Sequence, residues 1–121
     1  MFRFEKLEVW HKAVEVSDVI YAVTRTFPDN ERFGLTSQMR RAAVSVASNI
    51  AEGSSRISTA DFLRFIEIAY GSLMELVTQS LIAKRQGFLS EQNYNDAHQH
   101  SEQLARMLSG LRASLRPPEK R

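Results

Sequence analysis

The stretch "RRAAVSVASNIAEG", residues 40–53, decides the fold, because it has the period of an α-helix and almost no large side chains. Placed at about 100° per residue, its apolar side chains form two stripes instead of one. The main stripe contains Met39, Ala42, Ala43, Val46 and Ile50, and the second contains Val44, Ala47 and Ala51. A helix of a monomeric bundle needs only one stripe. The second therefore predicts contact with a further chain, whose backbone the small side chains allow to approach closely.

Glycine and proline divide the chain into four helical segments, and no segment shows the alternating pattern of a strand. The predicted helices cover residues 4–26, 37–51, 59–86 and 91–116. Thr36, Ser58 and Ser90 are the expected N-caps, and a left-handed Gly87 is expected to end the third helix. Because the turns are short, we predict an all-α, antiparallel up-down four-helix bundle. This domain covers residues 1–116 and is followed by a basic, disordered tail at 117–121.

The first and third predicted helices carry more apolar surface than one four-helix bundle can cover. The apolar arc of each spans roughly half the helix circumference, which is wider than the stripe of an ordinary bundle helix. An exposed apolar surface of this size is typical of a partner interface, and self-association is its simplest form. The residues expected at this interface are Trp10, Val44, Ala47, Ala51, Tyr70 and Met74. The alternative is that the fourth helix and the termini cover these side chains.

A polar strip lies beside the apolar stripes of the second and third helices. Its expected members are Arg41, Ser45, Asn49, Glu52, Ser72 and Glu75. An Arg41–Glu75 ion pair with hydrogen-bonding neighbours would select one register between the two helices. A mid-helix glycine costs about 1 kcal/mol relative to alanine, so Gly71 is expected where another backbone comes close.

The sequence lacks the side-chain patterns of an enzyme or of a metal protein. It contains no cysteine, which excludes disulfides and thiolate sites. His98 and His100 are two residues apart on a helix, so they point away from each other and cannot hold one ion together. There is no phosphate-binding glycine loop, and the carboxylates do not group into a site. We therefore expect no catalytic residue, no metal and no cofactor, and catalysis is the minority hypothesis.

Hydropathy predicts a soluble, cytoplasmic protein without a membrane partner. No apolar run approaches the roughly 18 residues that span a bilayer. Charged residues interrupt the N-terminal segment throughout, unlike a secretion signal. The net charge is only +2, which by itself does not indicate nucleic-acid binding.

A nucleic-acid surface is nevertheless one hypothesis, since several basic residues lie on or between the second and third helices. The candidates are Arg40, Arg56 and Arg64, with Arg32 and Lys12 near them. A ring would repeat each of them once per subunit and turn a modest patch into a basic band that attracts RNA or DNA. No aromatic RNA platform or recognition-helix motif accompanies them. The alternative is a purely structural or protein-binding ring with an unknown protein partner.

Four stretches carry a family resemblance: "FEKLEVWHKAVEV", "FPDNERFGLTSQMRRAAVSVASNIAEG", "FLRFIEIAYGSLMEL" and "LIAKRQGFLSEQNY". Over residues 4–115 the chain resembles the four-helix-bundle proteins encoded in intervening sequences of bacterial 23S rRNA genes. The resemblance implies a cytoplasmic bundle that assembles as a homopentameric ring, with no established biochemical activity for most members. A related branch contains the accessory proteins of diversity-generating retroelements. Resemblance to that branch implies a basic pentameric barrel that binds RNA and a reverse transcriptase.

The resemblance does not separate binding positions from packing positions. The family's characteristic positions in this chain are Trp10, Lys12, Phe33, Gly34, Leu35, Gln38, Arg40, Arg41, Ser45, Asn49, Glu52, Gly53, Gly71, Ser72 and Glu75. The chain departs from the pattern at Ala47, where relatives often have proline. Because proline kinks a helix, the second helix is expected to be straighter here.

Overall fold

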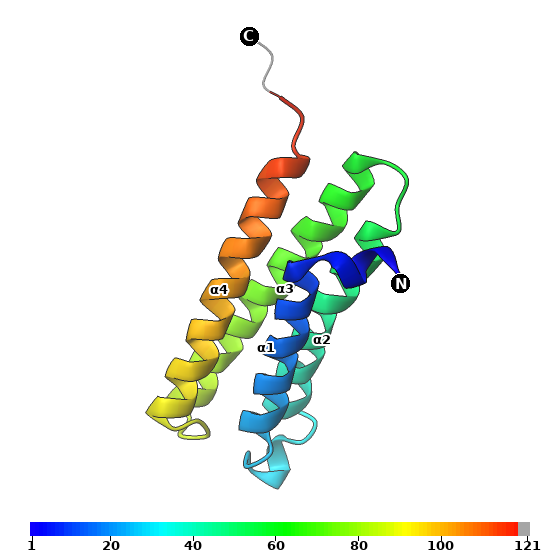
Figure 1. The fold of residues 1–121 in the computed structure, drawn as a ribbon. Coiled ribbons are helices and arrows are strands. Elements are labelled where there is room, and N and C mark those ends of the chain that lie inside the picture. Colours follow the sequence, from blue (N-terminus) through cyan, green and yellow to red (C-terminus); the bar gives the residue numbers. More distant parts are fainter. Residues whose placement is uncertain (119–121) are drawn as a thin grey trace.

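The computed structural model describes residues 1–118, which form four α-helices and two short 3-10 helices (Figure 1). The α-helices are α1 (Glu8–Thr24), α2 (Leu35–Ser54), α3 (Thr59–Arg85) and α4 (Glu91–Leu115). The 3-10 helices are η1 (Arg3–Lys6) and η2 (Asp29–Glu31). Residues 1–118 contain no strand, so the all-α, four-helix prediction is confirmed. The last three residues of the expected tail at 117–121 lie outside the described residues.

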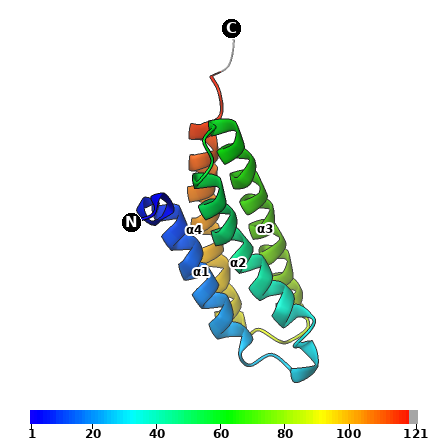
Figure 2. The same ribbon diagram turned by 90° about the vertical axis from the view of Figure 1, so that its right-hand side faces the viewer.

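Successive helices run in alternating directions, and each helix packs on two neighbours (Figure 1, Figure 2). α1 contacts α2 and α4, and α3 contacts the same two helices, with the most extensive contact between α2 and α3. Within residues 1–118, no Cα atom of α1 lies within 8 Å of a Cα atom of α3. They therefore lie at opposite corners of the bundle.

The main apolar stripes of the four helices meet in one core along the bundle. Its largest fully buried apolar side chains are Ile20, Met39, Ile50, Ile66, Leu73, Leu76, Leu104 and Leu108. The main stripe predicted for α2 is buried along its whole length. Burial of this apolar surface is the dominant favourable term that holds the helices together.

The N-caps of α3 and α4 are the serines that the sequence predicts. The Asp61 backbone N–H donates to Ser58 Oγ at 3.1 Å. The Asn93 backbone N–H donates to Ser90 Oγ at 3.0 Å. Each hydroxyl satisfies one of the N–H groups that the first turn of a helix leaves without a partner.

Gly87 ends α3 in the left-handed conformation, as predicted. Its φ is 82°, a value that favours glycine because a Cβ would clash. The Phe88 N–H donates to the Ala83 carbonyl at 2.9 Å. The Gly87 N–H donates to the Lys84 carbonyl at 3.0 Å. This pair of bonds is the Schellman motif, which satisfies the last carbonyls of the helix.

Thr36 is not the N-cap of α2, because the helix begins one residue earlier, at Leu35. Gly34 occupies the cap position and has no side chain that could accept a hydrogen bond. The Glu31 carboxylate in η2 supplies the acceptor instead, since its Oε1 accepts the Leu35 N–H at 3.0 Å. A cap supplied from a neighbouring turn explains why α2 starts before the predicted residue 37.

α2 also continues past its predicted end at residue 51, through Ser54. Gly53 lies inside the last turn and is buried against α3. A Cβ at Gly53 would lie 2.7 Å from Phe65 Cβ and 2.9 Å from Phe62 Cδ1. This glycine therefore lets α2 and α3 approach closely and does not end the helix.

α1 begins at Glu8 and not at residue 4, because the preceding residues form the separate turn η1. The ring of Phe4 packs against the ring of Trp10, with centroids 4.8 Å apart. η1 also contacts α2, and the Arg3 Cζ lies 5.7 Å from the centroid of the Phe62 ring. The N-terminal segment thus lies across the outside of the bundle at the beginning of α1, against α2 (Figure 1).

Candidate interaction surface

An open groove runs between α1 and α2 on the outside of the bundle. It is lined by Phe4, Trp10, Val14, Ser17, Val44, Ala47, Ser48 and Ala51. We call this surface the α1/α2 groove. Its α2 side is the second stripe of small residues, and Val44 is 43% exposed. Most of the expected interface lies here, namely Trp10, Val44, Ala47 and Ala51.

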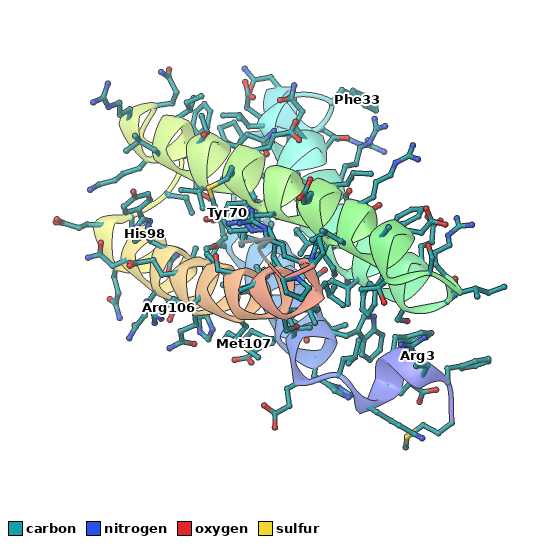
Figure 3. The ribbon with its side chains drawn as sticks, turned by 90° about the horizontal axis from the view of Figure 1, so that it is seen from above. Arg3, Phe33, Tyr70, His98, Arg106 and Met107 are labelled. Atoms are coloured by element: carbon teal, nitrogen blue, oxygen red, sulfur yellow. The ribbon has the colours of Figure 1, made fainter. Side chains whose placement is uncertain are left out.

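The structure does not bring Tyr70 and Met74 to the α1/α2 groove. Both residues lie on α3, at the corner of the bundle opposite α1. The Tyr70 ring is half-buried, and the Arg112 Cζ of α4 lies 4.3 Å from its centroid. Figure 3 shows this ring between the two helices. Tyr70 is therefore a packing residue of the α3–α4 contact, while Met74 is exposed on α3.

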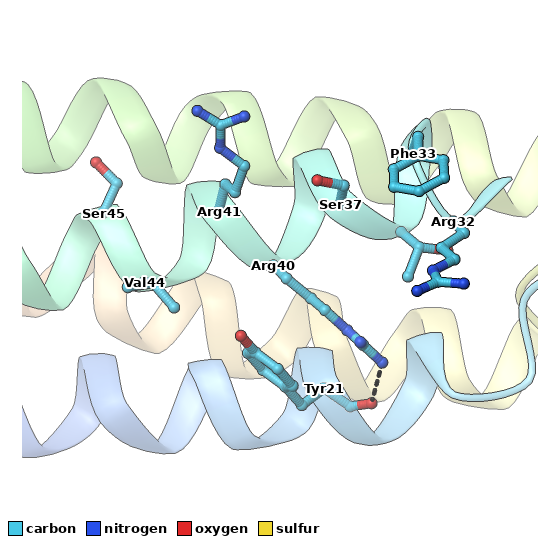
Figure 4. Close-up of a pocket in the computed structure, with 9 residues that line it drawn as sticks. Tyr21, Arg32, Phe33, Ser37, Arg40, Arg41, Val44 and Ser45 are labelled. Carbon is cyan, nitrogen blue, oxygen red and sulfur yellow. Dashed lines mark hydrogen bonds between the residues drawn. The ribbon is translucent and has the colours of Figure 1, made fainter.

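A second groove, which we call the polar groove, continues from the α1/α2 groove toward the beginning of α2 (Figure 4). It is lined by residues of α1, of α2 and of the segment before α2: Tyr21, Arg32, Phe33, Thr36, Ser37, Arg40, Arg41, Val44 and Ser45. Val44 belongs to both grooves, so they form one continuous surface. Phe33 is 87% exposed, and the Arg32 Cζ lies 5.3 Å from its ring centroid. Exposed aromatic and arginine side chains are enriched at protein interfaces.

Arg40 is held inside the polar groove by α1. Its Nε donates to Thr24 Oγ1 at 2.9 Å, and its Nη2 donates to the Tyr21 carbonyl at 3.5 Å (Figure 4). The guanidinium also lies 4.7 Å from the Tyr21 ring centroid. These contacts place a cation at the C-terminal end of α1, where the helix dipole favours positive charge. The sequence groups Arg40 with nucleic-acid candidates, but its guanidinium serves the α1–α2 contact.

Arg40→Met is expected to lower the free energy of unfolding by roughly 1–2 kcal/mol, because Thr24 Oγ1 and the Tyr21 carbonyl lose the guanidinium that donates to them. The Thr24 hydroxyl keeps its own bond to the Ile20 carbonyl at 2.7 Å. Arg85→Met is the matched control. Arg85 is exposed on α3 and makes no side-chain hydrogen bond or ion pair within residues 1–118, so its loss should stay within about 0.5 kcal/mol. Urea unfolding followed by circular dichroism measures both, and equal losses would contradict the structural role of Arg40.

Lys12 does not lie near the arginines of α2 and α3. Its Nζ is 3.4 Å from Glu15 Oε2 and 3.0 Å from His100 Nδ1 on α4. His100 Nδ1 in turn lies 3.3 Å from Glu15 Oε1. The Lys12 side chain is therefore largely buried at the α1–α4 contact. The expectation that it joins a basic surface with Arg40 is corrected by this placement.

Arg56 and Arg64 lie at the connection between α2 and α3 and are exposed. The Arg56 Cζ lies 4.7 Å from the Phe65 ring centroid. Among the described residues, every ion pair lies on α1 or α4. Within that part of the chain, Arg32, Arg56 and Arg64 therefore have no carboxylate within 4.0 Å, although Asp61 lines the same groove as Arg56 and Arg64.

The predicted polar strip is assembled in part. Ser45 Oγ and Ser72 Oγ are 2.9 Å apart and join α2 to α3. The Asn49 Nδ2 donates to the Ser45 carbonyl at 2.8 Å and to Ser45 Oγ at 3.1 Å. The structure thus brings these side chains into one hydrogen-bonded group between the two helices.

The charged members of the strip are not joined in this way. Arg41 and Glu75 line one groove beside Ser45 and Ser72, but no ion pair connects them within residues 1–118. Glu52 is exposed, and its backbone carbonyl accepts the Ser55 hydroxyl at 2.6 Å. The register of α2 on α3 is therefore marked by neutral hydrogen bonds and not by an ion pair.

Comparison with known proteins covers most of the chain. Residues 5–110 match the family model of the 23S rRNA-intervening sequence protein. The chain belongs to this family. Its fold is similar to the crystal structure of a protein with unknown function from the S23 ribosomal protein family of Bacteroides thetaiotaomicron VPI-5482, with a TM-score of 0.76. The two are 22% identical, over 85% of this chain and 96% of that chain. No curated protein matches the chain.

In this member of the 23S rRNA-intervening sequence protein family, α2 is one continuous helix through Ala47. Among residues 1–118, no three His, Asp or Glu side chains gather closely enough to hold a metal ion. In the same part of the chain, none of the helices combines the length and the apolar character that crossing a bilayer requires.

Proposed function

We propose that this protein is a non-catalytic, homo-oligomeric scaffold that forms a pentameric ring and binds RNA through exposed arginines. The observation that carries the proposal is the α1/α2 groove, where apolar and aromatic side chains line an open surface. Soluble monomers rarely keep a large apolar surface free. Copies of one chain that contact each other head to tail form closed rings when the rotation between them closes.

The subunit number of five and the kinship with retroelement accessory proteins come from the sequence resemblance. The cytoplasmic location is expected from hydropathy and from the resemblance. All three remain predictions. The α1/α2 groove of this chain is the surface proposed for assembly, and the number of subunits in the ring is taken from the resemblance.

The exposed arginines support the RNA part of the proposal. Arg32, Arg56 and Arg64 have no carboxylate within 4.0 Å in residues 1–118, and guanidinium groups bind phosphate in a bidentate manner. A ring would repeat them once per subunit, which strengthens the attraction of a polyanion. Arg40 and Lys12 are left out of this set, because Arg40 is hydrogen-bonded to α1 within the polar groove and Lys12 is largely buried at the α1–α4 contact. Arg32 lies before the start of α2, whereas Arg56 and Arg64 lie beyond its end, so within one chain the three arginines are not one patch.

The full chain is expected to bind a fluorescent single-stranded RNA with an affinity that falls steeply as salt increases. Arg56→Gln combined with Arg64→Gln should weaken binding at about 50 mM salt by roughly tenfold or more and flatten the salt dependence. Fluorescence anisotropy titrations at two salt concentrations measure both quantities.

Arg106→Gln combined with Arg116→Gln is the matched control for that titration. It removes the same charge from the end of α4, where both residues are exposed, and should leave RNA affinity unchanged. If the unaltered chain does not bind at about 50 mM salt, RNA binding is wrong and a ring that contacts only proteins takes its place. The exposed Phe33 and the low net charge of +2 favour that second candidate.

A further inference from the structure

α3 carries a face on its outer side, with two exposed isoleucines, that the rest of the described chain leaves uncovered. Five residues of this face follow one another at alternating steps of three and four positions: Ile68, Gly71, Glu75, Thr78 and Ile82. This spacing places them on one face of a helix. Ile68 and Ile82 are 45% and 43% exposed. We call these residues the α3 stripe.

Gly71 lies within the α3 stripe, and nothing in the described chain makes use of its missing side chain. A Cβ added to Gly71 would meet no atom within 4 Å. Gly53 differs, because its missing side chain lets α2 and α3 come together. A glycine in the middle of a helix costs about 1 kcal/mol relative to alanine. Gly71 therefore suits a close approach by a backbone from outside the chain.

A closed ring of more than two identical subunits needs two different surfaces on each subunit, because neighbours meet head to tail. The α1/α2 groove and the α3 stripe meet this need, since α1 and α3 lie at opposite corners of the bundle. We propose that the α1/α2 groove of one copy receives the α3 stripe of the next copy. The inference rests on the self-association in the proposed function and names the two surfaces that carry it.

The shapes of the two surfaces are complementary. Ser17, Ala47, Ser48 and Ala51 give the α1/α2 groove small side chains along its length. Ile68 and Ile82 stand out from α3 on either side of the low position at Gly71. Helices pack by placing the ridges of one into the grooves of the other. The two isoleucines act as the ridge, and Gly71 leaves room for the exposed Val44.

The charges of the two surfaces are also complementary. The polar groove that adjoins the α1/α2 groove contains Arg32 and Arg41, while the α3 stripe contains Glu75, which lines another groove beside Arg41 of its own chain without pairing with it. Within residues 1–118, neither arginine has a carboxylate within 4.0 Å. Docking brings Glu75 of the next copy toward this basic rim. The ion pair that the sequence predicts for Arg41 and Glu75 then forms between copies and not within one.

Two single substitutions test the pairing because each removes only one surface. Val44→Glu places a charge in the α1/α2 groove, and Ile68→Glu places a charge in the α3 stripe. Both positions are exposed in the single chain, so circular dichroism should show unchanged helicity. Each variant alone is expected to be a 13.8 kDa monomer by light scattering, because every contact needs one groove and one stripe.

An equimolar mixture of the two variants is expected to form a heterodimer. The intact stripe of the Val44→Glu chain docks in the intact groove of the Ile68→Glu chain, and the two damaged surfaces stop further growth. Gln99→Glu, an exposed change on α4, is the control and should assemble like the unaltered chain.

The other outcomes overturn the pairing in distinguishable ways. If Ile68→Glu assembles normally while Val44→Glu does not, the groove binds another surface and self-association survives. If both variants assemble normally, or if both are monomers that form no heterodimer, groove and stripe are not partners. If the unaltered chain is itself a monomer at high concentration, the proposed scaffold fails together with this inference.

Discussion

Leu73→Ala is expected to lower the free energy of unfolding by about 2–5 kcal/mol. Leu73 lies in the middle of α3 and is fully buried in the core. Truncation removes apolar atoms from this core and leaves a cavity that the packed helices fill only in part. Chemical denaturation followed by circular dichroism, at one fixed protein concentration, measures the loss.

Leu81→Ala provides the matched control, because the same atoms are removed from the same helix. Leu81 is 40% exposed, so it loses less burial and leaves no closed cavity, and a cost of about 1 kcal/mol or less is expected. A cost for Leu81→Ala as large as that for Leu73→Ala would mean that the core does not lie where the structure places it.

Gly53→Ala is expected to destabilise the protein by about 1–3 kcal/mol, although alanine favours helix formation. The new Cβ would lie 2.7 Å from Phe65 Cβ and 3.3 Å from the Phe62 carbonyl oxygen. These atoms belong to α3 or lie next to its backbone, so they cannot rotate away as the end of a flexible side chain would. Relief of this steric overlap requires α2 and α3 to move apart, which would also lengthen the Ser45–Ser72 hydrogen bond. Thermal unfolding should show a lower Tm.

Gly110→Ala makes the same change where a Cβ meets no atom within 4 Å. Gly110 lies inside α4 and is exposed, so alanine should stabilise the chain by up to about 1 kcal/mol. Opposite signs for the two glycines are the expected result. A stabilising Gly53→Ala would refute the close approach of α2 and α3.

The helices that could be predicted well are those whose signals are local. Ser58, Ser90 and Gly87 act within one turn of their own position, so the sequence is sufficient to place the ends of α3 and α4. The main apolar stripe of α2 follows from its period alone, and it is buried as predicted.

The boundaries that were wrong depend on contacts from outside the helix. The cap of α2 is the carboxylate of Glu31, which belongs to a different element. From the sequence alone, Gly53 is expected to end the helix. The structure shows that it lies inside α2, where its missing side chain makes room for Phe62 and Phe65. No local pattern contains either contact.

The same limit applies to the basic residues of the candidate surface. A sequence shows that Arg40 and Lys12 are charged, but their partners lie far away along the chain. Lys12 meets His100 across 88 positions, and Arg40 reaches Thr24 on another helix. Only the fold could separate these bound cations from Arg32, Arg56 and Arg64. The sequence predicts a close approach at Gly71, but only the fold shows that no atom of the described chain makes that approach and that Ile68 and Ile82 are exposed.

Trp10 is the single tryptophan of the chain, and it lies in the α1/α2 groove next to Phe4. The indole emission of this protein therefore comes entirely from one place on its surface. That place is the surface through which copies are proposed to meet. The emission of Trp10 therefore serves as an intrinsic fluorescent reporter of assembly, because its solvent exposure changes when another copy covers the α1/α2 groove.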